Sequence, residues 1–143
     1  MWFTTKVKYN RTDEQGLLKA VTEQYLVDAD SFTETEARIY EKLEEFIIGD
    51  FDVTDISKTN YSDVFFYNDA HIWYKCKINY YIADETTGKE KRITQYMLVE
   101  AETAKQAYDR IFESLSNMLV TFTVPDVIET KIVEVFEFQK NKD

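Results

Sequence analysis

An internal repeat constrains the fold of this chain more than any other feature of its sequence. Three segments of the first half align, in order, with three segments of the second half at offsets of 71 or 72 residues. The aligned pairs are 2–9 with 73–80, 21–45 with 93–117, and 51–67 with 122–138. This period is longer than that of the common solenoid repeats. We therefore predict a tandem duplication, in which residues 1–70 and residues 71–143 are two repeats of a single domain.

Each repeat has the pattern of a β-β-α-β unit. Residues 2–9 alternate between apolar and polar positions, as a strand does, with Phe3, Thr5, Val7 and Tyr9 on one face. A turn, a second strand, a helix and a third strand follow, and the second repeat has the same order. The segment 64–67 is a candidate for one more short strand. We expect an α+β fold with antiparallel sheet or sheets and two amphipathic helices packed on one face.

The expected secondary structure has recognisable boundaries. Turn-forming residues separate the first two strands, around Gly16 in one repeat and Gly88 in the other. Capping-box patterns begin the helices at Thr33 and Thr103. The last strand is expected over 122–138. Each helix then carries an apolar stripe: Ile39, Tyr40, Leu43, Phe46 and Ile47 in the first, and Ala107, Tyr108, Ile111, Leu115 and Met118 in the second.

The chain is acidic, with 17 Lys and Arg residues against 27 Asp and Glu residues and a net charge of -10. Such a charge repels nucleic acid and anionic membranes. The acids concentrate in residues 28–52, whereas the segments 1–20 and 72–93 are rich in Lys and Arg. We expect neither a signal peptide nor a membrane span, because residues 1–4 lack a basic region followed by an apolar core and no apolar run is long enough to cross a bilayer. We expect a cytoplasmic protein in which the single cysteine, Cys76, is a buried and inert thiol.

The candidate binding residues lie on the strand face opposite the core. They combine a tryptophan with two lysines in each repeat: Trp2, Lys6 and Lys8, and Trp73, Lys75 and Lys77. Aromatic rings beside cations form stacking platforms for nucleotides and single strands. A second interpretation is that the lysines solubilise an open sheet face while the tryptophans pack at a repeat or dimer interface. The sequence leaves both interpretations open.

The sequence lacks the residues that several kinds of catalytic or metal-binding site require. The three glycines are far apart, so they form no phosphate-binding loop, and the chain contains one histidine, His71, and one cysteine. A zinc site of the usual kinds needs more of these side chains. We therefore expect no catalytic residues, no metal site and no cofactor, and we do not expect an enzyme.

Three stretches of the sequence resemble a known family. These are residues 2–9, residues 21–37 and residues 73–77, of which Tyr25–Glu34 is the most specific part. The family consists of uncharacterised small proteins from gut Bacteroidota and from their phages and mobile elements. The resemblance implies a bacterial cytoplasm, often with phage genes nearby, and it implies no activity and no catalytic residues.

Three functional hypotheses follow from the sequence. The first is a non-enzymatic phage or mobile-element accessory protein that binds an anionic ligand and sequesters a nucleotide-type immune signal of the host. The second is a replication accessory that binds single-stranded nucleic acid, which the net charge disfavours. The third is an acidic protein-interaction module, or DNA mimic, that inhibits a host protein. Self-association into a homo-oligomer fits all three, because exposed strand edges favour it.

Overall fold

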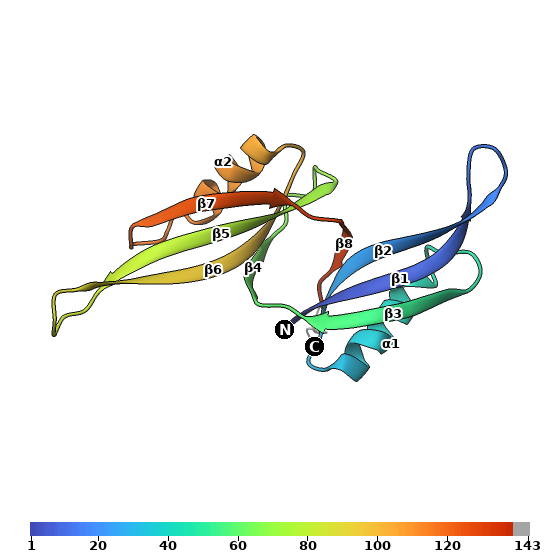
Figure 1. Ribbon diagram of the computed structural model, residues 1–143, viewed down its shortest axis with the longest axis horizontal. Helices are drawn as coiled ribbons and strands as arrows, with labels where there is room; N and C mark the ends of the chain where they lie inside the picture. Colours follow the sequence, from blue (N-terminus) through green and yellow to red (C-terminus); the bar gives the residue numbers. More distant parts are fainter. Residues whose placement is uncertain (139–143) are drawn as a thin grey trace, which may run out of the picture. The chain divides into compact units, whose positions relative to one another are not determined.

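The computed structural model describes residues 1–138, which form an α+β protein (Figure 1). The α+β class that we expected is confirmed, whereas an origin by duplication stays a prediction. The same order of elements occurs twice: two strands, a helix and two strands. The elements are β1 (Trp2–Thr12), β2 (Leu18–Asp28), α1 (Phe32–Leu43), β3 (Phe51–Lys58), β4 (Tyr61–Phe65), β5 (Ile72–Ala83), β6 (Glu90–Ala101), α2 (Ala104–Ser114), β7 (Phe122–Glu129) and β8 (Ile132–Phe136).

The strands form two four-stranded sheets, with the orders β3-β1-β2-β8 and β4-β6-β5-β7. Three strands of each sheet are antiparallel neighbours. The fourth strand is parallel to its neighbour, because β8 pairs with β2 and β4 pairs with β6 (Figure 1). Both sheets are therefore mixed but mostly antiparallel. We expected antiparallel sheets, and the two parallel pairings were not predicted.

The fourth strands are exchanged between the two halves of the chain. β4 follows β3 in the sequence but joins the sheet of β5–β7, and β8 follows β7 but joins the sheet of β1–β3. The chain consequently divides into two compact units, which we call unit 1 (residues 1–59 and 131–138) and unit 2 (residues 60–130). The strand expected over 122–138 is really two strands, because the chain crosses at Thr130 and Lys131. The boundary at residue 70 concerns the sequence repeat and stays a prediction.

Each unit has its own apolar core between a helix and one face of its sheet. The predicted alternation in β1 is confirmed, because Phe3, Thr5 and Val7 are buried. The core of unit 1 contains Val7, Tyr25, Val27, Ile39 and Leu43. The core of unit 2 contains Tyr74, Cys76, Ile78, Met97, Val99, Ala101, Ala107 and Ile111.

The helix boundaries agree with the prediction in one unit and differ in the other. The Thr103 side chain caps α2 and accepts a hydrogen bond from the Gln106 amide at 3.1 Å, as predicted. In α1 the cap is Ser31 instead of Thr33, because Ser31 also has a glutamate three residues later and accepts from the Glu34 amide. Helix α1 ends at Leu43, so Phe46 lies beyond it and is 68% exposed instead of joining the apolar stripe.

The turns between paired strands follow the prediction. The Asp13 carboxylate accepts hydrogen bonds from the Gln15 and Leu17 amides, both at 2.9 Å, and Gly16 has a φ angle of 80°. In unit 2, the Asp84 carboxylate accepts from the Thr86 amide at 2.8 Å. These bonds to the charged form lower the pKa of Asp84. Among the described residues, neither helix is long and apolar enough to cross a membrane.

Candidate functional site

The predicted lysines of unit 1 face carboxylates on the neighbouring strand. Lys6 lies opposite Asp55 of β3, Lys8 lies opposite Asp52, and all four side chains belong to exposed residues. Opposite charges at such cross-strand positions attract one another, so these carboxylates offset the positive charge that the lysines bring to this face. An anion approaching unit 1 here meets a face of mixed charge.

The two tryptophans have a structural position in common. The main-chain carbonyl of Trp2 accepts hydrogen bonds from the Thr59 amide and hydroxyl, both at 2.9 Å. The carbonyl of Trp73 accepts equivalent bonds from Thr130, at 2.9 and 2.7 Å. Trp73 is only 4% exposed and packs edge-on against Phe66, with 5.2 Å between the ring centroids. The Trp73 ring is therefore a packing residue in this structure, with little surface left for stacking a ligand.

Two tyrosines that the sequence analysis did not single out lie beside the predicted lysines of unit 2. The Lys75 ammonium is 4.6 Å from the ring centroid of Tyr96 and 5.9 Å from that of Tyr61. Lys77 lies opposite Tyr96 on one side and Asp126 on the other. Burial raises the pKa of Tyr61, which keeps its hydroxyl neutral. We call Tyr61, Lys75, Lys77 and Tyr96 the tyrosine–lysine patch. Placing β6 beside β5 in the correct register would have identified Tyr96 as a neighbour of these lysines.

A second surface lies in unit 1, between α1 and the exchanged strand β8. It contains two hollows, of about 530 and 190 Å³, and Phe136 borders both. We call the two hollows together the α1–β8 trough. The larger is lined by Val27, Arg38, Glu41, Lys42, Phe136, Glu137 and Phe138, and the smaller by Tyr25, Leu43, Phe46, Val133, Glu134 and Phe136. Sequence reasoning missed this surface because it depends on the crossing of β8.

Hydrogen bonds and ring contacts hold the side chains of the trough. Arg38 donates to the Asp28 carbonyl, forms an ion pair with Glu34, and places its guanidinium carbon 3.5 Å from the ring centroid of Phe138. The rings of Tyr25 and Phe136 stack with 5.7 Å between centroids. The Arg38 guanidinium is thus already paired within unit 1. Lys42 is the other basic side chain that lines the trough.

The smaller hollow has a negative electrostatic environment. The Glu23 carboxylate accepts hydrogen bonds from the hydroxyls of Tyr25, at 2.9 Å, and Tyr9. Burial raises the pKa of Tyr25, and the Glu23 and Glu134 carboxylates raise it further because they oppose a second negative charge. Two carboxylates, those of Glu23 and Glu134, thus lie close enough to Tyr25 to act on its hydroxyl.

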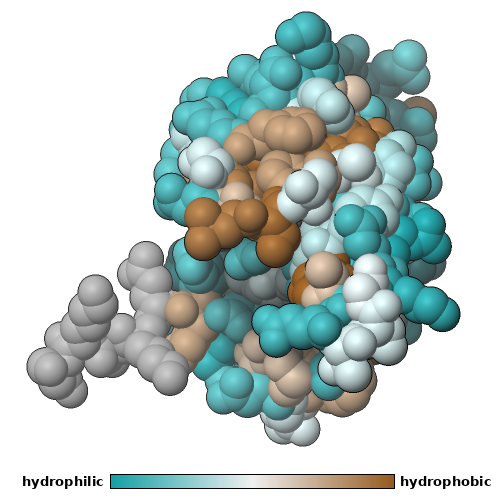
Figure 2. Space-filling model, turned by 90° about the vertical axis from the view of Figure 1, so that its left-hand side faces the viewer, coloured by the Kyte–Doolittle hydropathy of each residue, from teal (hydrophilic) through white to brown (hydrophobic). Residues whose placement is uncertain are grey.

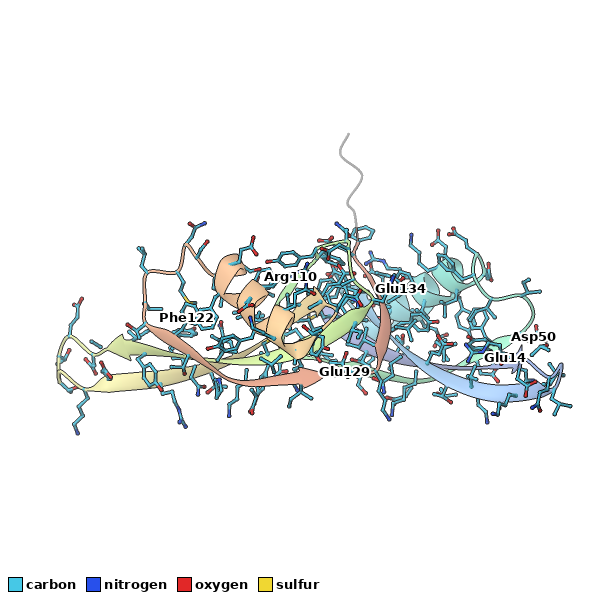
Figure 3. All side chains as sticks on the ribbon, turned by 90° about the horizontal axis from the view of Figure 1, so that it is seen from above. Glu14, Asp50, Arg110, Phe122, Glu129 and Glu134 are labelled. Carbon is cyan, nitrogen blue, oxygen red and sulfur yellow. The ribbon has the colours of Figure 1, made fainter. Side chains whose placement is uncertain are left out.

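The corresponding region of unit 2 is held together by side chains. The Tyr67 hydroxyl donates to the Arg110 carbonyl at 3.1 Å and lies 2.8 Å from the Ser114 hydroxyl oxygen. Arg110, labelled on α2 in Figure 3, donates to both carboxylate oxygens of Asp69 at 2.8 and 2.7 Å. The amides of Tyr67 and Asn68 donate to Glu100. These hydrogen bonds hold the segment after β4 against α2 and β6.

Comparison with known proteins gives one match. The sequence model of a domain family described as "Domain of unknown function (DUF4494)" matches residues 1–138. The chain belongs to the DUF4494 family. Searches of curated proteins and of solved structures found no match.

The remaining chemically notable side chains of this DUF4494 protein have packing or surface positions. Cys76 is buried as expected, and burial raises the pKa of its thiol to about 12, so the nucleophilic thiolate is disfavoured. His71 is exposed, and its backbone amide donates to Glu102 at 3.0 Å. Within residues 1–138, no group of three or more His, Cys, Asp or Glu residues is placed to hold a metal ion.

Proposed function

We propose that this DUF4494 protein is a non-catalytic protein-interaction module that holds a basic segment of a partner protein in the α1–β8 trough. The observation that carries the proposal is the trough itself, where exposed aromatic side chains line hollows on an acidic part of the surface. Phe46 and Phe138 are 68% and 45% exposed. Exposed aromatic residues bordering a hollow are typical of binding surfaces, because they bury much area at little entropic cost.

The charges around the trough favour a basic partner. Glu41, Glu134 and Glu137 line the two hollows, and Glu44 and Glu45 follow directly after α1. The basic side chains of the lining are Arg38, which is paired with Glu34, and Lys42. A negative surface accelerates association with a positive partner and disfavours acidic ones. This arrangement supports the hypothesis of an acidic protein-interaction module.

Selection from a library tests the proposal. A random twelve-residue peptide library is selected on the immobilised chain, and the recovered peptides are measured by fluorescence anisotropy. We expect recovered peptides to be rich in Lys or Arg and to bind at least tenfold more weakly to a Glu41→Lys/Glu45→Lys variant. A Glu85→Lys/Glu90→Lys variant, whose charge changes equally in the β5–β6 hairpin, is the matched control. Equal losses in both variants, or no charge bias among the peptides, would contradict the proposal.

The tyrosine–lysine patch of unit 2 supports a second candidate function, the binding of an anionic ligand. Lys75 beside two tyrosine rings combines a cation with aromatic surface, as nucleotide-binding proteins do. In its specific form, the protein is a phage or mobile-element protein that sequesters a nucleotide-type immune signal in a bacterial or phage-infected cytoplasm. Single-stranded nucleic acid is an alternative ligand, recognisable by a steep loss of affinity as salt rises.

Thermal melting with a panel of nucleotides and cyclic dinucleotides tests this second candidate. We expect a bound nucleotide to raise the melting temperature, the rise to disappear in Lys75→Ala, and the rise to persist in Lys6→Ala on the open face of unit 1. A panel in which every member leaves the melting temperature unchanged would rule out nucleotides of these classes.

We also infer that the two units descend from a tandem duplication. The order of elements, the strand order of the sheets and the threonine bonds to Trp2 and Trp73 all recur. The exchanged fourth strands suggest an ancestor in which two copies of one repeat exchanged these strands. We also propose that the present chain forms homo-oligomers, which native mass spectrometry would detect directly.

A further inference from the structure

We infer that the smaller hollow of the α1–β8 trough receives a single lysine or arginine side chain of the partner. This inference rests on the proposed function and adds to it the chemical group that the partner must present. The hollow is formed where the end of α1 and the segment after it approach β8, and it is lined by six residues of unit 1. Its size, its aromatic lining and its carboxylate together define what fits.

The size of the hollow suits one side chain. Its volume is about 190 Å³. Pockets that bury small-molecule ligands measure roughly 300–1,000 Å³. The hollow is therefore small for a cofactor or a nucleotide, and an inserted side chain is a better match. The larger hollow, which Phe136 also lines, leaves room for neighbouring parts of the same segment.

The lining suits the long apolar stem and the cationic end of a basic side chain. Tyr25, Phe46 and Phe136 contribute aromatic rings, while Leu43 and Val133 contribute aliphatic surface. Lysine and arginine pack their methylene groups along apolar surface and keep the charge at the tip. A cation near aromatic rings is stabilised by their electron-rich faces, and more strongly where water is removed.

Carboxylates at and next to the lining supply the charge complement. Glu134 lines the hollow, and the Tyr25 hydroxyl, from another lining residue, donates a hydrogen bond to Glu23 at 2.9 Å. Hydrogen bonds between a guanidinium or ammonium group and a carboxylate are stronger than neutral ones. An apolar side chain gains nothing from these carboxylates, so the hollow should distinguish lysine from an apolar residue of equal length.

Unit 2 offers a built-in comparison, because the aligned positions have different residues. Met97, which is 1% exposed, takes the position of Tyr25, and Asp63 takes that of Glu134. Tyr67 ties the segment after β4 to α2 through hydrogen bonds to the Arg110 carbonyl and the Ser114 hydroxyl. The aromatic ring of Tyr25 is thus replaced by a methionine in unit 2, and substitutions in unit 2 serve as controls.

Nuclear magnetic resonance titration of the full chain tests the inference. The probes are Nα-acetyl-lysine methylamide, its arginine counterpart and its norleucine counterpart, which lacks the charge. We expect saturable shifts of Tyr25, Phe46 and Phe136 with the basic probes and at least fivefold weaker binding of norleucine. Glu134→Gln and Phe46→Ala should each weaken lysine binding at least threefold. Asp63→Asn and Leu119→Ala, at an aligned and an exposed position of unit 2, should change it less than twofold.

Each outcome bears on the inference separately from the proposed function. Shifts that are equal for lysine and norleucine, or unaffected by Glu134→Gln and Phe46→Ala, would overturn the subsite. Basic peptides whose binding depends on Glu41 and Glu45 would still support the proposed function in that case. A shortened variant that ends at Phe138 is titrated in the same way. If it binds the lysine probe and the full chain does not, the hollow belongs to Lys140 or Lys142 of this chain, and the assignment to a partner is overturned.

Discussion

Unit 1 and unit 2 have the same strand order, but their fourth strands are followed by different contacts. In unit 2, the segment after β4 returns to the helix, where Asp69 binds Arg110 and Tyr67 bonds to the last turns of α2. In unit 1, the residue after β8 that aligns with Tyr67 is Phe138, which is 45% exposed beside Arg38. The segment after the fourth strand is thus hydrogen-bonded to the helix in unit 2, whereas Glu137 and Phe138 in unit 1 line the α1–β8 trough.

The exposed apolar residues also distinguish the two units. Both units expose an aliphatic residue in the loop after the helix, Ile48 and Leu119. The exposed aromatic residues differ in position, because Phe46 and Phe138 of unit 1 line the trough, whereas Tyr108 and Phe112 of unit 2 belong to α2. Figure 2 looks onto the hairpin end of unit 2 and shows hydrophobic side chains reaching the surface among hydrophilic ones. Single exposed apolar residues need no functional explanation. The aromatic residues of unit 1 differ because they border hollows.

The largest expected effect on stability comes from substitutions in the apolar core, which both units have. Ile39 and Ile111 occupy equivalent helix positions, and both are 0% exposed. We expect Ile39→Ala and Ile111→Ala each to lower the free energy of unfolding by about 2–5 kcal/mol, because each leaves a cavity in its core. Urea unfolding followed by circular dichroism measures both. A negligible effect at one position would show that the two cores are not equivalent.

The next largest effect is also on stability, and it should differ between the two units. Arg110→Ala should lower the free energy of unfolding, because it removes hydrogen bonds to the exposed Asp69 carboxylate and to the Glu100 carbonyl. Arg38→Ala should cost less, because its ion-pair partner Glu34 lies one turn away on the same helix. The same urea titrations compare the two variants. A greater loss in Arg38→Ala would reverse this part of the comparison.

Helix capping gives a smaller effect that is the same in both units. Ser31→Ala and Thr103→Ala should each cost about 1 kcal/mol, because each removes the acceptor for an amide of the first turn. Thr33→Ala, at the position that the sequence pattern favoured, should be close to neutral. Thermal unfolding of the three variants ranks them, and a larger loss at Thr33 than at Ser31 would contradict the observed start of α1.

The smallest effect is a pH dependence specific to unit 2. The Arg110 guanidinium lowers the pKa of Asp69 below its ordinary value of 3.8. A carboxyl with a lowered folded pKa stabilises the fold above its unfolded pKa, and this contribution is lost as pH falls through the folded value. The stability difference between wild type and Asp69→Asn should therefore shrink below pH 3.8. Urea unfolding from pH 5 downward measures it, and a constant difference would contradict the ion pair.

Much of the fold follows from local sequence patterns. The alternation in β1, the turns at Asp13 and Asp84 and the cap at Thr103 depend on neighbouring residues, so their signals are present in the sequence. The exchange of β4 and β8 was not predicted. A strand of five residues pairs equally well in either sheet by its pattern alone, and its partner is decided by contacts far along the chain.

The candidate site was less predictable than the fold, for the same reason. Alternation placed Lys6 and Lys75 on the open faces, but it could not show the carboxylate opposite Lys6 or the burial of Trp73. Those depend on the register between strands. The α1–β8 trough combines residues more than 90 positions apart, such as Leu43 and Glu134. Its existence depends on the crossing strand, which no local pattern encodes.

The most direct test of the proposed function is to map where a basic peptide binds. The strongest peptide from the selection is titrated into the isotope-labelled full chain, and backbone and aromatic resonances are followed. We predict saturable shifts at Phe46, Phe136 and Phe138, in the α1–β8 trough. Shifts centred instead on Lys75 and Tyr96 of unit 2, or spread evenly over all acidic side chains, would contradict a partner site in unit 1.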